Sequence, residues 1–317
     1  MLDKPHSFEQ QLFQIVRQIA DEIDTDRIKL SNHDLLSHCD NLRNAVDYVL
    51  DPHFPHEIAE TALNLLIAEK YGAGLLSSVD PARACSKIIR ELQSRLPTQT
   101  WRSNAQIVNQ QFSTPASIGY LMASLLGVRA SDVVLEPSCG TGNLAAWAVA
   151  AGASVIANEI DPRRADLAKM IGLKPTSHNA ELIDDLLPAD QIPNVVMMNS
   201  PFSSNGGRTK TASTKFGFRH VESALRRLAT GGKFGVILGA NGSPSALLGR
   251  SFWTSLEPHI KLFASIEIDG REYYRNGTTV NVVLIVGRKG PFSSDIVPRS
   301  VTVQTVEEAL SFFAEPL

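Results

Sequence analysis

The chain has 317 residues, 43% of them apolar and 20% charged, so it can bury one large core or two ordinary ones. This composition argues against extensive disorder, and no apolar run approaches the length of a membrane span. The start of the chain lacks the pattern of a secretory leader, so we expect a soluble protein of the cytoplasm. The three cysteines, Cys39, Cys85 and Cys139, are too widely spaced to predict a disulfide framework or a metal site.

The net charge of −3 is unevenly distributed along the chain. Residues 1–100 contain 15 acidic and 10 basic side chains, net −5, and the other 217 residues contain 18 and 20, net +2. If the partner is a nucleic acid, its phosphates should therefore meet local basic loops in the second part of the chain.

Residues 1–105 are predicted to form a helical N-terminal domain. Leu12, Ile15, Val16, Ile19 and Ile23 recur with the helical period. A second helix through residues 58–71 is expected to end at Gly72. Asp80 and Pro81 offer an N-cap and a first-turn proline for a third helix. We find no catalytic constellation in this part of the sequence.

Residues 106–290 are predicted to form an α/β domain, because short apolar runs alternate with helical stretches. The predicted strands cover 133–135, 154–157, 195–198, 234–238 and 282–286, and the predicted helices cover 143–151, 162–171 and 219–229. This alternation is typical of a mainly parallel sheet with helices on both faces, which binds ligands at the carboxyl ends of its strands. Residues 291–317 are expected to form a C-terminal extension with a short strand and a helix.

The first predicted strand leads into a candidate cofactor loop, Glu136-Pro137-Ser138-Cys139-Gly140-Thr141-Gly142. Two glycines there permit a tight turn and a close approach to a ligand. Glu159 follows the second strand, where a carboxylate can accept hydrogen bonds from two ribose hydroxyls. The loop also fits a loose dinucleotide pattern, but Glu136 would repel a pyrophosphate and attract an amino or sulfonium group. Charge therefore favours S-adenosylmethionine over NAD.

Four segments in this order resemble the amino-group DNA methyltransferases, especially the N6-adenine enzymes whose methionine-binding segment comes first. They are Phe112-Ser113-Thr114-Pro115, the loop 136–142, the stretch 158–161 and the tetrapeptide Asn199-Ser200-Pro201-Phe202. The resemblance covers about residues 111–287. It implies an α/β, Rossmann-like S-adenosylmethionine-dependent methyltransferase fold with a mainly parallel seven-stranded sheet, preceded here by the helical domain.

A narrower likeness concerns residues 96–103 and 110–115. They resemble the methylase portion of bacterial plasmid and phage proteins that fuse a methyltransferase to a strawberry-notch-type helicase. This chain has no GxxxxGK[ST] loop, so we expect a helicase partner to be either absent or a separate chain.

The resemblance implies a role for individual residues around the cofactor. Phe112, Thr114 and Pro115 would line its methionine end, and the loop from Glu136 through Pro137, Ser138, Cys139 and Gly140 to Gly142 would wrap it. Glu159 would bind the ribose, Ile160 would pack on the adenine, and Asn179 and Ala180 would follow a third strand at the adenine edge. Asn179 stands where the family usually has Asp, but its carbonyl oxygen can still accept from an amino group.

The resemblance also assigns the tetrapeptide a chemical task. The lone pair of an exocyclic amine is delocalised, and two acceptors that hold its N–H groups would localise that pair toward the methyl group. In the family these acceptors are the first side chain and the second backbone carbonyl, while the aromatic residue stacks on a flipped base. Asn199 and the backbone carbonyl of Ser200 can supply the two acceptors, and Phe202 can supply the stacking ring. Ser200 replaces the usual proline before Pro201, and the site thereby gives up the fixed φ of that proline.

DNA contacts are expected from two further segments. Residues 203–219 carry Arg208, Lys210, Lys215 and Arg219 and no acid, which suits a basic loop over bound phosphates, with a solvated disordered loop as the alternative. Tyr273 resembles the aromatic residue that packs on the flipped base, with core packing as the alternative.

The sequence thus predicts methylation of the N6 amino group of adenine in DNA. Cytosine N4, an RNA base, a glutamine amide and a non-catalytic DNA-binding subunit are the alternatives. About 30 residues follow the last predicted strand, too few for an ordinary target-recognition domain, so we expect low sequence specificity or specificity lent by the N-terminal domain or a partner.

Overall fold

The structure is a computed structural model that describes residues 7–42, 51, 53–99, 113–200, 215–292 and 297–314. Its centre is one seven-stranded sheet in the order β2-β1-β3-β4-β6-β5-β7. The strands are β1 (Val133–Glu136), β2 (Ser154–Ala157), β3 (Val195–Asn199), β4 (Lys233–Gly239), β5 (Ile260–Ile268), β6 (Val282–Lys289) and β7 (Arg299–Val303). Only β6 runs antiparallel to its two neighbours, β4 and β5, so the predicted mainly parallel α/β sheet is confirmed.

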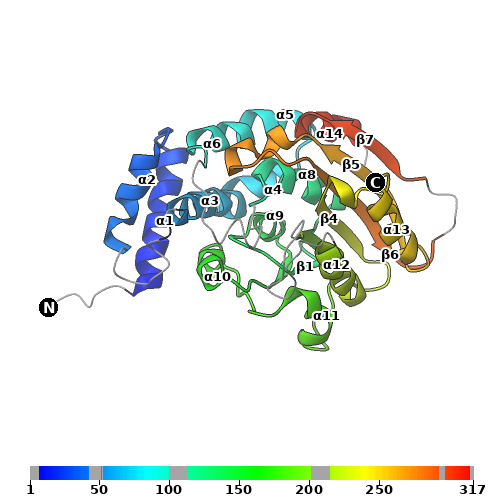
Figure 1. Cartoon of the computed structure of the whole chain (residues 1–317). Coiled ribbons are helices and arrows are strands. Elements are labelled where there is room, and N and C mark those ends of the chain that lie inside the picture. The colour runs from blue at the N-terminus through cyan, green and yellow to red at the C-terminus, as the bar shows by residue number, and fades with distance from the viewer. Residues whose placement is uncertain are drawn as a thin grey trace.

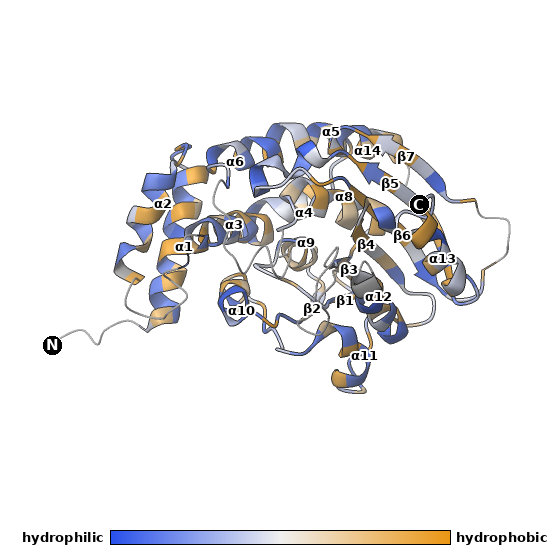
Figure 2. Ribbon diagram, viewed as in Figure 1, coloured by the Kyte–Doolittle hydropathy of each residue, from blue (hydrophilic) through white to orange (hydrophobic). Residues whose placement is uncertain are grey.

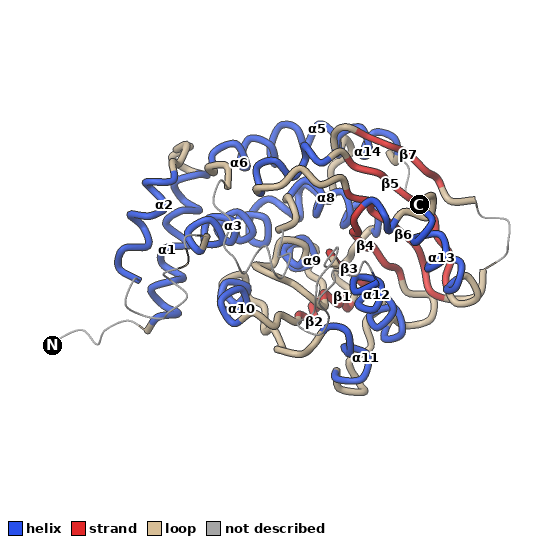
Figure 3. Tube along the Cα trace, viewed as in Figure 1, coloured by secondary structure: helices blue, strands red, loops and turns tan. Residues whose placement is uncertain are grey.

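The strands that complete the seven-stranded sheet are not all at the positions that the sequence predicted. The expected third strand before Asn179 is reduced to a single bridge between Asn158 and Thr176. Pro175 lacks a backbone donor and interrupts any longer ladder there. Instead β5, which the sequence analysis missed, and β7 from the C-terminal extension complete the opposite edge, where they lie side by side (Figure 3).

Helices cover both faces of the sheet (Figure 1). Alternate strand residues point to opposite sides, so Val134 and Met197 join one apolar cluster and Leu135 and Met198 join the other. The first cluster includes α8 (Ala116–Leu126), α9 (Ala145–Ala150), α10 (Pro162–Lys169) and α14 (Val306–Phe312); the second includes α11 (Ile183–Leu186), α12 (Lys215–Arg227) and α13 (Leu247–Leu256). Within the described ranges, no helix is both long and apolar enough to cross a membrane.

The N-terminal helices form the outer part of the first cluster. They are α1 (Phe8–Asp24), α2 (Asn32–Cys39) and α3 (Phe54–Leu66), followed by α4 (Gly72–Leu76), α5 (Pro81–Ala84) and α6 (Arg90–Arg95). Ser7 and Gln10 close a capping box that starts α1, whose apolar residues recur along the helix in Figure 2 and are buried as predicted. The cluster runs on without a break into α8 and α9, so these helices share a core with the sheet.

The second N-terminal helix does not end at Gly72, which corrects the sequence-based expectation. The chain continues from α3 through the π-helical turn η3 (Ile67–Tyr71) into α4, and Gly72 has helical angles of −62° and −42°. A Cβ atom at Gly72 would lie only 2.4 Å from Cβ of Ala150 in α9. The glycine is therefore needed for close helix packing and not for a C-cap.

Candidate active site

The loop between β1 and α9 has the backbone that the glycines predicted. Gly140 and Gly142 have φ values of +56° and +91°, in the left-handed region that disfavours other residues. A Cβ atom at Gly140 would also lie 2.6 Å from Nη2 of Arg164. Each glycine therefore meets a conformational need, and Gly140 also leaves room for a guanidinium.

Glu136 lies at the end of β1 with only 2% of its surface exposed. The backbone N–H groups of Ala145 and Leu144 at the start of α9 act to lower its pKa, and its Oε2 has no hydrogen-bond partner in the described chain. Burial raises the pKa of Glu136 well above its usual value, and the neighbouring Glu159 adds to the shift. A buried acceptor without a partner suits the cationic group that the sequence predicted here.

Glu159 connects the end of β2 to this loop. Its Oε2 accepts from the backbone N–H of Gly140 at 2.7 Å, and its Oε1 accepts from Asp161 at 2.9 Å. Each carboxylate oxygen can accept a second hydrogen bond, so both remain able to bind hydroxyl groups.

Asn158 is a structural residue of the site that the sequence analysis passed over. Its Nδ2 donates to the carbonyl oxygens of Pro137 and His178, at 2.9 and 3.0 Å. Its Oδ1 accepts from the His178 backbone N–H at 2.7 Å and from the Thr176 hydroxyl at 2.8 Å. One buried amide thus joins the cofactor loop to the segment that replaces the third strand.

The residues predicted at the adenine end lie just beyond this amide. Ile160 is 63% exposed, which is unusual for a large apolar side chain beside a buried carboxylate. Asn179 accepts from the backbone N–H of Glu181 at 3.0 Å through Oδ1, and Ala180 is buried. The carbonyl oxygen of Asn179 keeps a second lone pair for an amino group.

Thr114 brings the cofactor loop and the tetrapeptide together. Its carbonyl oxygen accepts from Nδ2 of Asn143 at 2.8 Å, and its hydroxyl oxygen accepts from Nδ2 of Asn199 at 2.9 Å. Three segments that are separate in the sequence therefore meet at one threonine. Ser200 continues the sheet by donating its backbone N–H to Ile237 at 3.2 Å, and its buried hydroxyl has no hydrogen-bond partner in the described chain.

Several predicted residues are not placed by the structure. Phe112, Pro201, Phe202, Arg208 and Lys210 lie outside the described residues, and Lys215 is described only as the start of α12.

Tyr273 is described, and its side chain is fully buried in the apolar cluster that includes α8. Core packing, the alternative in the sequence analysis, is therefore what the structure shows for Tyr273. The exposed aromatic residue of the same turn, η7 (Gly270–Asn276), is Tyr274, which is 62% exposed.

The polar residues of α3 were not predicted to take part in the site. All thirteen residues of α3 are buried, polar ones included. Asn64 donates through Nδ2 to the carbonyl oxygen of Thr141 at 3.1 Å and to Oδ1 of Asn143 at 3.0 Å. A polar stripe at helical spacing ordinarily faces water, so the sequence gave no signal that this one reaches the cofactor loop.

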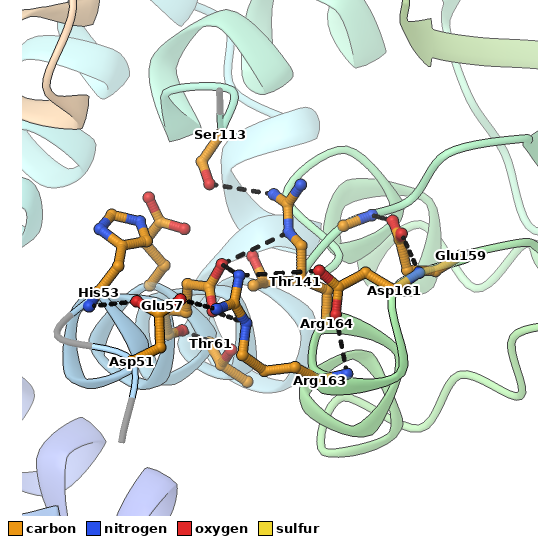
Figure 4. A network of polar contacts seen from close by, with 12 residues as sticks. Asp51, His53, Glu57, Thr61, Ser113, Thr141, Glu159, Asp161, Arg163 and Arg164 are labelled. Carbon is orange, nitrogen blue, oxygen red and sulfur yellow. Dashed lines mark hydrogen bonds and ion pairs between the residues drawn. The ribbon is translucent and has the colours of Figure 1, made fainter. Parts of the chain in front are cut away.

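A buried ion-pair network joins α3 to α10 (Figure 4). Asp161 caps α10 and Pro162 opens it, which fixes the direction of the next side chain, Arg163. Arg163 contacts Glu57 through Nε at 2.8 Å and through Nη2 at 3.1 Å, and Nη1 contacts Asp51 at 2.6 Å. Burial raises the pKa of Glu57 to about 8, against the pull of Arg164 and Arg163.

Comparison with known proteins identifies the fold. No protein-family model and no curated protein matches the sequence. Among solved structures, the modification subunit of a putative type I restriction enzyme from Vibrio vulnificus YJ016 is similar, with a TM-score of 0.51 and 14% identity over 89% of this chain and 66% of that chain. A putative class I S-adenosylmethionine-dependent methyltransferase from Listeria monocytogenes gives 0.50 and 14%, over 94% of each chain.

A type I restriction-modification methyltransferase subunit from Streptococcus thermophilus gives a TM-score of 0.51 and 13% identity, over 98% of this chain and 94% of that chain. The chain thus has the fold of S-adenosylmethionine-dependent methyltransferases, as the sequence predicted. These comparisons lend no support to the narrower likeness to strawberry-notch-type proteins.

Proposed function

We propose that this protein is an S-adenosylmethionine-dependent methyltransferase that acts on the N6 amino group of adenine in DNA. The observation that carries the proposal is the position of Thr114, whose two oxygens accept from Asn143 of the cofactor loop and from Asn199 of the tetrapeptide. A methyl donor bound along the loop would therefore lie next to an amine bound at Asn199, and proximity supplies much of the rate enhancement in such transfers.

The residues of the loop fit this cofactor. The glycine backbone would approach it closely, the unpartnered Oε2 of Glu136 would attract its positive charge, and Glu159 would accept from its ribose. Ile160, which is 63% exposed, would cover one face of the adenine. When bound, the cofactor supplies an electrophilic methyl group on a sulfonium.

The tetrapeptide would hold the amine through two hydrogen-bond acceptors. The hydrogen bond from Nδ2 of Asn199 to Thr114 fixes the amide, so its carbonyl oxygen faces away from Thr114 and can accept one N–H of the substrate. The backbone carbonyl of Ser200 would accept the other N–H, and Phe202 would stack on the flipped base. Arg208, Lys210 and Lys215 would bind phosphates beside it, which makes binding dependent on salt.

We further propose that target selection depends on the N-terminal helices or on a partner chain. Two of the similar structures are subunits of type I restriction-modification systems, which supports an assembly in which other chains contribute. The isolated chain should then methylate DNA with little sequence preference, and modified-base sequencing that finds one fixed long site would contradict this.

The main experiment is mass spectrometry of nucleosides from DNA treated with the wild type and with Asn199→Ala. The wild type should form N6-methyladenine, and Asn199→Ala should lose at least about a hundredfold in rate, because one of two acceptors is gone. Calorimetric binding of S-adenosylhomocysteine should survive the substitution and serves as the control for folding. Methylcytosine, product only on RNA or protein, or no product despite cofactor binding would contradict the proposal.

Ser200→Pro tests the unusual residue of the tetrapeptide. It restores the family's proline but removes the hydrogen bond to Ile237, so we expect retained activity and a loss of about 1 kcal/mol in the free energy of unfolding. A well-folded but inactive Ser200→Pro would show that the serine hydroxyl takes part in the reaction.

A further inference from the structure

Two adjacent arginines of α10 differ sharply in how their donors are used. Arg163 and Arg164 are buried, with 4% and 7% of their surface exposed. Arg163 donates from both terminal nitrogens to carboxylates, Nη1 to Asp51 at 2.6 Å and Nη2 to Glu57 at 3.1 Å. Its Nε lies 2.8 Å from Oε2 of Glu57 without making a hydrogen bond in the described chain. A guanidinium has five N–H donors, and Arg163 therefore uses the donors of two of its three nitrogens.

Arg164 uses few of its donors. Its Nε lies 3.7 Å from Oε1 of Glu57 and makes no hydrogen bond in the described chain. Its Nη2 makes one long hydrogen bond of 3.3 Å to the hydroxyl of Ser113. Buried polar groups are nearly always satisfied, so a buried guanidinium with unused donors is a candidate to bind a ligand.

The place of this guanidinium identifies the kind of ligand. It lies directly over Gly140, where a Cβ atom would come within 2.9 Å of its Cζ. Figure 4 shows the side chain extending from α10, between α3 and the cofactor loop, toward Ser113. Ser113 precedes Thr114, so the guanidinium lies beside the part of the site assigned to the methionine end of the cofactor.

The guanidinium of Arg164 keeps its charge although it is buried. Burial lowers the pKa of Arg164, but Glu159, Glu57 and Glu60 more than offset that effect, so the guanidinium stays charged. The same loop carries the unpartnered carboxylate oxygen of Glu136. A guanidinium with unused donors and a carboxyl group with an unused acceptor at one loop match the carboxylate and the ammonium group of an α-amino acid.

We propose that Arg164 binds the α-carboxylate of the cofactor's methionine end, while Glu136 faces its α-ammonium group. The inference rests on the proposed cofactor and assigns a residue that neither the motifs nor the resemblance singled out. The competing role is that of a counter-ion for Glu57 and Glu60, with no ligand contact.

Binding of three ligands separates these roles. S-Adenosylhomocysteine carries the carboxylate, S-adenosyl-3-thiopropylamine lacks only that group, and 5′-methylthioadenosine lacks the whole amino acid end. Calorimetry with the wild type should show S-adenosylhomocysteine binding about 10- to 100-fold more tightly than the amine, as a charge-assisted hydrogen bond predicts. In Arg164→Gln this ratio should fall to nearly one, while the affinity for 5′-methylthioadenosine stays within about threefold.

Arg163→Lys is the matched control, because it weakens the neighbouring ion pairs and should leave the ratio unchanged. If Arg164→Gln does not fold, Arg164→Lys is the second variant. It keeps the charge but lacks the paired donors of the guanidinium, so the ratio of the two affinities should still fall several-fold. Equal losses for all three ligands, or an unchanged ratio, would overturn the proposal and leave Arg164 as a counter-ion. If the wild type binds none of the ligands, the proposed function itself fails, which is a different result.

Discussion

Helices α1 and α3 lie next to each other in the N-terminal part of the chain but have opposite surroundings. Helix α1 buries one apolar face, and its ion pair between Arg17 and Glu69 lies in solvent, with side chains 46% and 47% exposed. Helix α3 is buried on every side, and its polar residues contact α10 and the cofactor loop.

The difference shows what each helix contributes. Exposed ion pairs add little to stability, so α1 is held by its apolar face. The buried acids and amides of α3 are useful only if distant parts of the chain satisfy them. Helix α3 is thus part of the scaffold of the site, and its sequence alone would place it on the surface.

The largest expected effect on stability comes from breaking a buried ion pair of α3, and an exposed ion pair of α1 serves for comparison. Glu57→Ala leaves Arg163 buried without its main partner and should lower the free energy of unfolding by about 3–5 kcal/mol. Glu69→Ala removes the exposed pair with Arg17 and should cost under about 1 kcal/mol. Urea denaturation of both variants measures the contrast. Similar small losses would mean that the α3 network does not hold the fold together.

A pH titration tests the burial of α3 in a second way. Burial lowers the pKa of His56 from 6.5 to about 4, so the unfolded chain binds this proton more readily. The stability that neutral His56 contributes is complete above pH 6.5 and is lost as the pH falls toward 4, by about 3 kcal/mol at most.

His56→Gln should flatten this part of the stability curve. Urea denaturation at a series of pH values would show the difference between variant and wild type. A variant that loses stability in acid as steeply as the wild type would assign the acid sensitivity to other groups.

The smallest effect concerns two glycines where the helix that begins with α3 meets α9. Gly72→Ala places a Cβ atom 2.4 Å from Ala150 and should cost about 1–3 kcal/mol through overpacking. Gly74→Ala has no atom within 4 Å of the new methyl and should stabilise the helix by about 0.5–1 kcal/mol. Thermal unfolding should move the two midpoints in opposite directions; a shift in the same direction would contradict the packing argument.

Local patterns predicted much of the architecture because they depend on neighbouring residues. The period of Leu12 to Ile23 gave α1, and the apolar runs gave five strands of the sheet. Strand β5 was missed, and the third strand was expected where only Thr176 forms a bridge. Gly72 was assigned to a helix end because a close approach to Ala150, 78 positions away, leaves no trace in nearby sequence.

The sequence by itself determined the α/β fold and the order of the segments that meet at the candidate site. Glycines at 140 and 142, a carboxylate at 159 and an amide at 199 have recognisable spacing, since strand ends and turns constrain residues locally. Only the tertiary structure decided that Tyr273 packs in the core, that Asn64 supports the cofactor loop, and that Arg163 bonds two carboxylates while Arg164 makes one long hydrogen bond to Ser113. Those outcomes depend on burial and on partners far apart in the chain, and these are set when the helices pack against the sheet.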